Sequence, residues 1–244
     1  MFKLTETDHI TAGENMQVGT DLVIISGFVT MFVSLVLSIY LGRKWYKQDV
    51  RLMTDLPLVF AIAMVCNTLN ALFLTLPSIG VLEPSLNLFR LRSIAIGGAV
   101  IPVWGALLQI WASKYEKYHN RTVLLLSIYW FAVALLGPSE AFIMSLTIPL
   151  LFIISIAMMG TFVITWKTGR LKEVRSELLV LSMFFMLVSQ GLRVPLMLTP
   201  LFYIPDVILI ASMVFLGFGF GNPWQNRDSK KASKDSQQLV QYAE

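Results

Sequence analysis

The sequence predicts an all-α membrane protein: a seven-transmembrane helix bundle with its N-terminus outside and its C-terminus in the cytoplasm. Of 244 residues, 56% are hydrophobic and 14% are charged, against roughly 25% charged residues in soluble domains. The charges are clustered and leave long uncharged runs, and most basic residues fall on one side of the predicted bundle. This composition excludes a soluble enzyme, a disordered chain and a nucleic-acid-binding protein.

The uncharged runs define the predicted spans, because a helix needs about 20 mainly apolar residues to cross a hydrocarbon core. Five runs lie between successive charges, and a sixth of 44 residues, Leu178–Gly221, is interrupted only by Arg193 and Asp206. That last run holds two spans, since Pro200 ends one helix and suits the first turn of the next. The seven predicted spans are residues 21–42, 56–78, 93–113, 122–138, 141–166, 178–198 and 201–221.

Basic residues predict the orientation of these spans. Three of them, Lys3, Arg90 and Arg92, lie on the side predicted to be outside. Fifteen lie on the other side, which the positive-inside rule assigns to the cytoplasm. They are Arg43, Lys44, Lys47, Arg51, Lys114, Lys117, Arg121, Lys167, Arg170, Lys172, Arg175, Arg227, Lys230, Lys231 and Lys234. The basic excess therefore reports topology and contact with anionic lipid, not nucleic-acid binding.

The two ends of the chain are predicted to lie outside the transmembrane domain, which covers residues 21–224. Residues 1–20 form a polar extracytoplasmic tail without the basic start and apolar centre of a cleavable signal. The first span is therefore expected to direct insertion. Residues 225–244 are basic and rich in Ser, Lys and Gln, which predicts a disordered cytoplasmic tail.

Two charges at membrane depth are candidate site residues. Arg193 and Asp206 each lie five residues inside the predicted outer ends of the sixth and seventh spans, where a charge costs at least about 2.5 kcal/mol. One interpretation is an outward-facing pocket in which Arg193 receives a carboxylate or another anion and Gln190 adds a contact. The alternatives are a structural ion pair, or an arginine that reaches the membrane interface.

Three further residues are candidates for ligand binding. Asn67 and Asn70 share one face of the second span, and amides there either contact a ligand or join helices by hydrogen bonds. Trp104 lies in the middle of the third span, away from the interface where tryptophan is common. It either lines a pocket for an apolar ligand or packs in the core.

The start of the third span carries basic residues on the side that is otherwise poor in them. Arg90 and Arg92 either contact lipid head groups or form a binding rim with Glu83 and Glu140. Glycines in the third and seventh spans predict close helix packing. These glycines are Gly97, Gly98, Gly105, Gly217 and Gly221.

No metal, cofactor or catalytic set is expected. His9 and His119 both lie outside the spans, and no Cys, His, Asp and Glu residues have metal-ligand spacing. No span contains a lysine, and Ile210 stands four residues after Asp206, where microbial opsins carry the retinal-binding lysine. No acid–base pair or nucleophile–base set is visible, so the chain is expected not to be an enzyme.

One stretch of the third span resembles a known family. Residues 96–104, Ile-Gly-Gly-Ala-Val-Ile-Pro-Val-Trp, and residues 112–115, Ala-Ser-Lys-Tyr, are similar to the corresponding helix in seven-transmembrane sensor regions of prokaryotic histidine kinases. The resemblance covers some 20 of 244 residues. It implies a sensor-like membrane module.

The sequence therefore favours a non-enzymatic receptor- or sensor-like protein in the cell membrane. It is expected to bind a small ligand or a lipid from the outer side, between the third, sixth and seventh spans, and to act through a separate cytoplasmic or membrane protein. A first alternative is a small-solute transporter built from a 3+1+3 helix repeat, because Asn67, Asn70 and Pro77 align with Gln190, Arg193 and Pro200. A second alternative is a structural subunit or assembly factor of a membrane complex.

Overall fold

The computed structural model describes residues 6–48, 52, 55–169, 174–196, 199 and 201–221, with the backbone alone for residues 6–20 and 194. In this part of the chain every regular element is a helix, and there is no strand. The helices are α1 (Glu6–Tyr46), α2 (Leu56–Ser78), α3 (Leu86–Trp111), the short η1 (Ser113–Tyr115), α4 (Glu116–Leu136), α5 (Glu140–Thr168), α6 (Ser176–Leu196) and α7 (Ile204–Gly221).

The seven α-helices are each long and apolar enough to cross a membrane, α4 together with the η1 turn before it. Their outward faces carry large apolar side chains, among them Phe32 at 68%, Leu125 at 71% and Leu136 at 79% exposure. A water-soluble protein rarely exposes apolar patches of this kind. The helices therefore indicate a multi-pass integral membrane protein, and the prediction of seven apolar helices is confirmed.

Three helices begin well before their predicted spans, and one of them is α4, which starts at Glu116 where the prediction had residue 122. α1 starts at Glu6, so the segment 6–20 continues the first span as helix, where the sequence predicted a polar tail. α3 starts at Leu86, where Ser85 caps it by accepting a hydrogen bond from the Leu88 amide. The predicted spans are bounded by charged residues, but a helix can continue through a charged residue. Arg90 and Arg92 are both part of α3. The predicted tail 225–244 lies outside the described residues.

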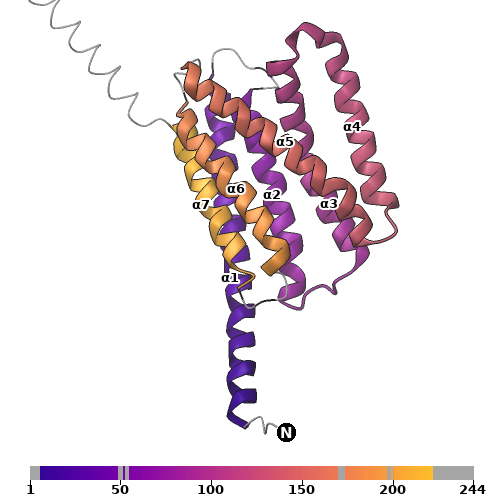
Figure 1. The fold of residues 1–244 in the computed structure, drawn as a ribbon, viewed down its shortest axis with the longest axis vertical. Helices are drawn as coiled ribbons and strands as arrows, with labels where there is room; N and C mark the ends of the chain where they lie inside the picture. The colour runs from indigo at the N-terminus through magenta and orange to yellow at the C-terminus, as the bar shows by residue number, and fades with distance from the viewer. Residues whose placement is uncertain are drawn as a thin grey trace, which may run out of the picture.

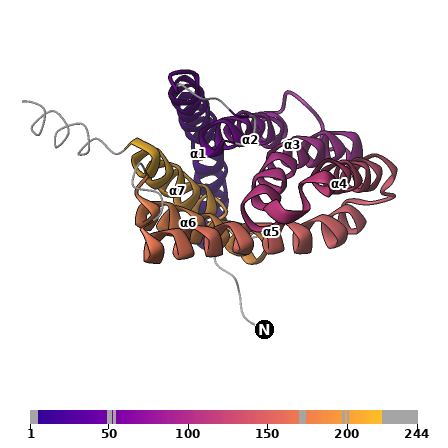
Figure 2. The ribbon, with the colours of Figure 1, turned by 90° about the horizontal axis from the view of Figure 1, so that it is seen from above.

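The helices form a closed arrangement in which the first and last are neighbours. Consecutive helices pack side by side from α1 to α7, α7 returns to α1, and α5 also contacts α3. Figure 1 shows α5 crossing the bundle obliquely, and Figure 2 shows α1 to α4 on one side with α5, α6 and α7 on the other. The chain alternates direction, so Arg193 and Asp206 lie at one end of the bundle and Lys44 at the other. We call these the Arg193 end and the Lys44 end.

Glycines allow close packing, but against side chains and not between backbones. A Cβ on Gly97 would lie 2.4 Å from the Trp130 indole, which is fully buried and donates to the Ser93 carbonyl at 2.8 Å. A Cβ on Gly98 would lie 2.8 Å from the Cys66 sulfur. Gly105 has more room, since its nearest neighbour would be 3.7 Å away. On α7 the closest approach is at Gly219, which the sequence interpretation did not name.

Candidate functional site

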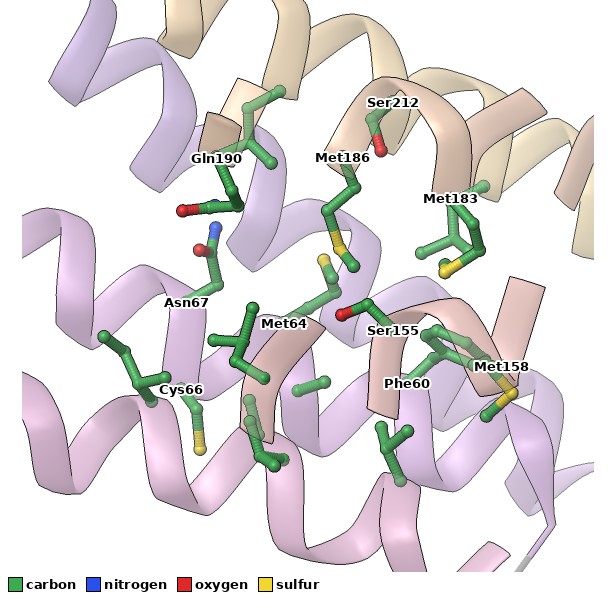
Figure 3. Close-up of a pocket in the computed structure, with 18 of the residues that line it drawn as sticks. Phe60, Met64, Cys66, Asn67, Ser155, Met158, Met183, Met186, Gln190 and Ser212 are labelled. Atoms are coloured by element: carbon green, nitrogen blue, oxygen red, sulfur yellow. The ribbon is translucent and has the colours of Figure 1, made fainter. Parts of the chain in front are cut away.

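A cavity of about 160 Å³ lies at the centre of the bundle, between α2, α3, α5, α6 and α7. No described side chain of α1 or α4 belongs to its wall. The wall is mainly apolar, and amides and hydroxyls add a few polar groups. Figure 3 shows Asn67 and Gln190 facing one another at one end, and Phe60 and Met158 at the other. A concave apolar site with few polar groups is typical of ligand pockets.

Methionine is concentrated in this wall. Five of the twelve methionines line the cavity, and they come from α2, α5, α6 and α7: Met64, Met158, Met183, Met186 and Met213. In Figure 3 the side chains of Met64 and Met186 point toward one another across the cavity. A methionine side chain is unbranched and polarisable, so it adapts its shape to different contacts. The wall can therefore change shape around an occupant.

Amides mark the end of the cavity nearer Arg193. Asn67, Asn70 and Gln190 all line it. Asn67 also donates from Nδ2 to Ser34 Oγ on α1 at 2.9 Å, which fixes its orientation between α1 and the cavity. The remaining polar wall groups include Ser182 and Ser212, which are bonded to each other. The amides are therefore the polar groups that an occupant meets at this end.

Arg193 and Asp206 form an ion pair between α6 and α7. Arg193 Nη2 lies 2.5 Å from Asp206 Oδ1, and Ser26 Oγ on α1 donates to Asp206 Oδ2 at 3.0 Å. Asp206 is only 4% exposed. Adjacent antiparallel helices thus bring the two charges together, and each neutralises the other.

A second, smaller cavity of about 10 Å³ adjoins this pair. It shares Asn67 and Asn70 with the central cavity, and Thr30, Arg193 and Asp206 also line it. The Thr30 hydroxyl and Arg193 Nε are buried without a hydrogen bond to any described residue. Polar groups therefore extend from the ion pair to the centre of the bundle.

Arg92 is the second arginine near this end of the cavity. Its Nε lies 3.4 Å from Asn70 Oδ1, at the long limit of a hydrogen bond, and its guanidinium lies 5.6 Å from the centre of the Phe89 ring. Arg193 and Glu140 both act on it electrostatically. No carboxylate in the described part of the chain lies within 4.0 Å of it.

The structure brings together most of the residues that the sequence singled out. Arg193, Asp206, Asn67 and Asn70 surround the small cavity, and Gln190 joins the two asparagines in the central one. Trp104 lines neither cavity and packs against the core. The pocket expected between the third, sixth and seventh spans also has walls from α2 and α5.

Sequence reasoning missed the methionines and the inward position of Arg92. Met183 and Met186 lie three residues apart on α6, which places them on one helix face. Methionine has the hydropathy of an ordinary residue of a membrane span, so hydropathy does not single it out. The spacing of Met183 and Met186 is the one feature of the sequence that indicates a shared methionine face. The sequence interpretation places Arg92 at the surface, in contact with lipid head groups or in a binding rim, and nothing in its neighbourhood in the sequence indicates that it turns toward α2.

Among the described residues, no three His, Cys, Asp or Glu side chains lie close enough together to hold a metal ion. The side chains around the two cavities can bind through apolar contact, amide hydrogen bonds and arginine. Comparison with protein-family models, with curated proteins and with solved structures finds no match for this chain.

Proposed function

We propose that this chain is a non-enzymatic, receptor- or sensor-like membrane protein that binds a small, mainly apolar ligand in the central cavity. The observation that carries the proposal is the cavity itself, which five helices line and which has amides at one end. An apolar cavity of about 150 Å³ accommodates a molecule of the size of benzene. Because methionine side chains adapt their shape, the cavity can also accept somewhat larger ligands.

Two of the cavity helices carry a proline well inside them. Pro102 lies in α3 and Pro149 in α5. Proline removes the backbone hydrogen bond to the residue four positions earlier and weakens the helix there. A ligand shifts helix packing only by its difference in affinity between two packings. The prolines supply places where α3 and α5 can bend differently with and without the ligand.

The proposed orientation has the Arg193 end outside and the Lys44 end in the cytoplasm, in the cell membrane. Its support is the excess of basic residues at the Lys44 end. The ligand then enters from the outer side, where the amides lie. A partner protein, in the membrane or the cytoplasm, responds to the change in packing. The resemblance of residues 96–104 to sensor regions agrees with this proposal.

The test measures binding of 2-phenylethanol, a phenyl ring with a two-carbon chain and one hydroxyl, to the full chain in phosphatidylcholine nanodiscs. Equilibrium dialysis of the radiolabelled compound is expected to show saturable binding. Ala99 lines the cavity, so Ala99→Phe fills it and is expected to abolish binding. The matched control is Ala132→Phe, on an exposed face of α4 that contributes nothing to the cavity. Binding that persists in Ala99→Phe contradicts the proposed site.

Transport of a small solute is the second candidate function. It is favoured by Asn67 and Asn70, which line both cavities and thus continue a polar path from the ion pair to the bundle centre. Flux of a solute into proteoliposomes that stops in Asn70→Ala would support transport. Saturable binding without flux of the same solute would favour the receptor-like function.

A further inference from the structure

We infer that the ligand of the central cavity is a small amphiphile with a carboxylate head group, which Arg92 binds beside Asn70. The inference rests on the proposed function and adds the chemical class of the ligand. It differs from the expectation drawn from the sequence, in which Arg193 receives the anion. The structure assigns that role to the other arginine because the two guanidiniums have different partners.

Arg193 already has a carboxylate partner. Asp206 Oδ1 lies 2.5 Å from its Nη2, and Asp206 is held in place by Ser26. A ligand anion that took Arg193 would leave the carboxylate of Asp206 buried without its counter-charge, which is strongly unfavourable. The pair as a whole carries no net charge. Arg193 Nε has no hydrogen bond to a described residue, but it is buried, and the cavity of about 10 Å³ that Arg193 lines has room for about one water molecule and not for a ligand.

Within the described part of the chain, Arg92 has no carboxylate partner. Glu140, an exposed residue at the start of α5, acts on it electrostatically but forms no ion pair with it. The contact of Arg92 with Asn70 Oδ1 is long, at 3.4 Å. The side chain is partly buried and turned toward α2, whereas Arg90, two residues earlier, donates to the Gly137 carbonyl at the end of α4. Arg92 therefore keeps a positive charge uncompensated at short range, next to a residue of the cavity wall.

The chemistry of a carboxylate fits this position. An ionised carboxylate only accepts hydrogen bonds, and a guanidinium donates two parallel ones to it. Arg92 itself lines neither cavity, but Asn70 lines both, so an anion bound between these two side chains can extend the rest of its molecule past Asn70 into the central cavity. There it meets apolar groups such as Met186 and Phe60. The occupant is then an acid whose apolar part has about the size of a benzene ring.

The experiment compares three probes that share a ring and a chain length and differ in head-group charge. They are phenylacetate, 2-phenylethanol and 2-phenylethylamine, each measured by equilibrium dialysis against the full chain in phosphatidylcholine nanodiscs. Phenylacetate is expected to bind about tenfold more tightly than 2-phenylethanol, since a charge-assisted hydrogen bond is roughly twice as strong as a neutral one. The amine is expected to bind no better than the alcohol.

Arg92→Gln is expected to lower phenylacetate affinity by about tenfold and to change 2-phenylethanol affinity by less than about twofold. The matched control Arg90→Gln removes a charge from the same turn and is expected to leave phenylacetate affinity unchanged. Arg92→Lys keeps the charge but loses the paired donors, so its phenylacetate affinity is expected to lie between those of the unaltered protein and Arg92→Gln. This variant carries the test if Arg92→Gln does not fold.

The outcomes separate this inference from the proposed function. Equal affinities for phenylacetate and 2-phenylethanol, or tight phenylacetate binding in Arg92→Gln, would contradict the inference that Arg92 binds a ligand carboxylate. Either result would leave the proposed function intact. Absence of binding for all three probes contradicts the proposed function itself. Loss of phenylacetate binding in nanodiscs that contain phosphatidylglycerol would contradict a free acid as the ligand and would indicate that Arg92 binds a lipid head group.

Discussion

Arg193 on α6 and Asp206 on α7 form an ion pair that also holds α1, because Ser26 donates to the second oxygen of the same carboxylate. The pair lies where three helices meet at the Arg193 end. The last two helices and the first one, which is far from them in the sequence, thus share contacts with one buried carboxylate. Its removal is expected to affect stability more than any surface charge does.

Asp206→Asn keeps the shape of the side chain and removes its charge, so Arg193 remains without a counter-charge. Breaking a buried pair on one side costs about 3–5 kcal/mol of unfolding free energy. The double variant Arg193→Gln/Asp206→Asn is expected to lose less than the sum of the single losses, measured by unfolding titration in mixed micelles. Glu177→Gln is the control, since its pair with Arg175 is 3.9 Å long and well exposed, and should cost about 1 kcal/mol or less. Additive losses would show that the two charges act independently.

Ser26→Ala removes the α1 donor to Asp206 and leaves one carboxylate oxygen without that partner. A hydrogen bond to a charged group contributes about 1.5–3 kcal/mol, so the unfolding free energy is expected to fall by that order. Ser145→Ala provides the comparison, because that exposed hydroxyl bonds only to the Phe142 carbonyl of its own helix. The same titration measures both variants. Equal, small effects would mean that Ser26 does not hold α1 to α7.

Gly97→Ala is expected to destabilise the bundle by about 1–3 kcal/mol, the usual cost of overpacking a core. The added methyl group would lie 2.4 Å from the buried Trp130 indole, which cannot move without losing its bond to Ser93. Gly160→Ala on α5 is the control, since nothing lies within 4 Å of its added Cβ. Its thermal midpoint should stay the same or rise, because alanine favours a helix over glycine. A stable Gly97→Ala would contradict the tight contact.

Single cysteines test the proposed orientation. Cys66 is the only cysteine, so Cys66→Ala gives a background without thiols. Ile79→Cys places one in the exposed connection between α2 and α3, and Lys47→Cys places one just after α1. The positive-inside rule predicts that an impermeant maleimide labels the first in intact cells and the second only after permeabilisation. The reverse labelling pattern would show that the protein has the opposite orientation, with the amide end of the cavity on the cytoplasmic side.

Much of the fold follows from the sequence because lipid imposes one simple requirement, an apolar run of sufficient length. The contact of Arg193 with Asp206 follows as well, since the sixth and seventh spans are consecutive and antiparallel and each residue lies five positions inside its predicted outer end. The sequence does not show which residues of different helices face one another across the bundle. Met64 and Met186 are far apart in the chain, and their shared cavity depends on how α5 crosses the bundle. The inward turn of Arg92 and the helical start of α1 at Glu6 are equally invisible to hydropathy.

Four hydroxyl residues recur along α1 at every fourth position: Ser26, Thr30, Ser34 and Ser38. All four are buried, and three of them bond to α7 or α2 through Asp206, Met213 and the Ala61 carbonyl. α1 is a single unbroken helix of 41 residues, and its first part projects past the Arg193 end (Figure 1). A rotation of α1 about its own axis therefore strains its contacts with α2 and with α7 at the same time, because the hydroxyls that make them belong to one helix.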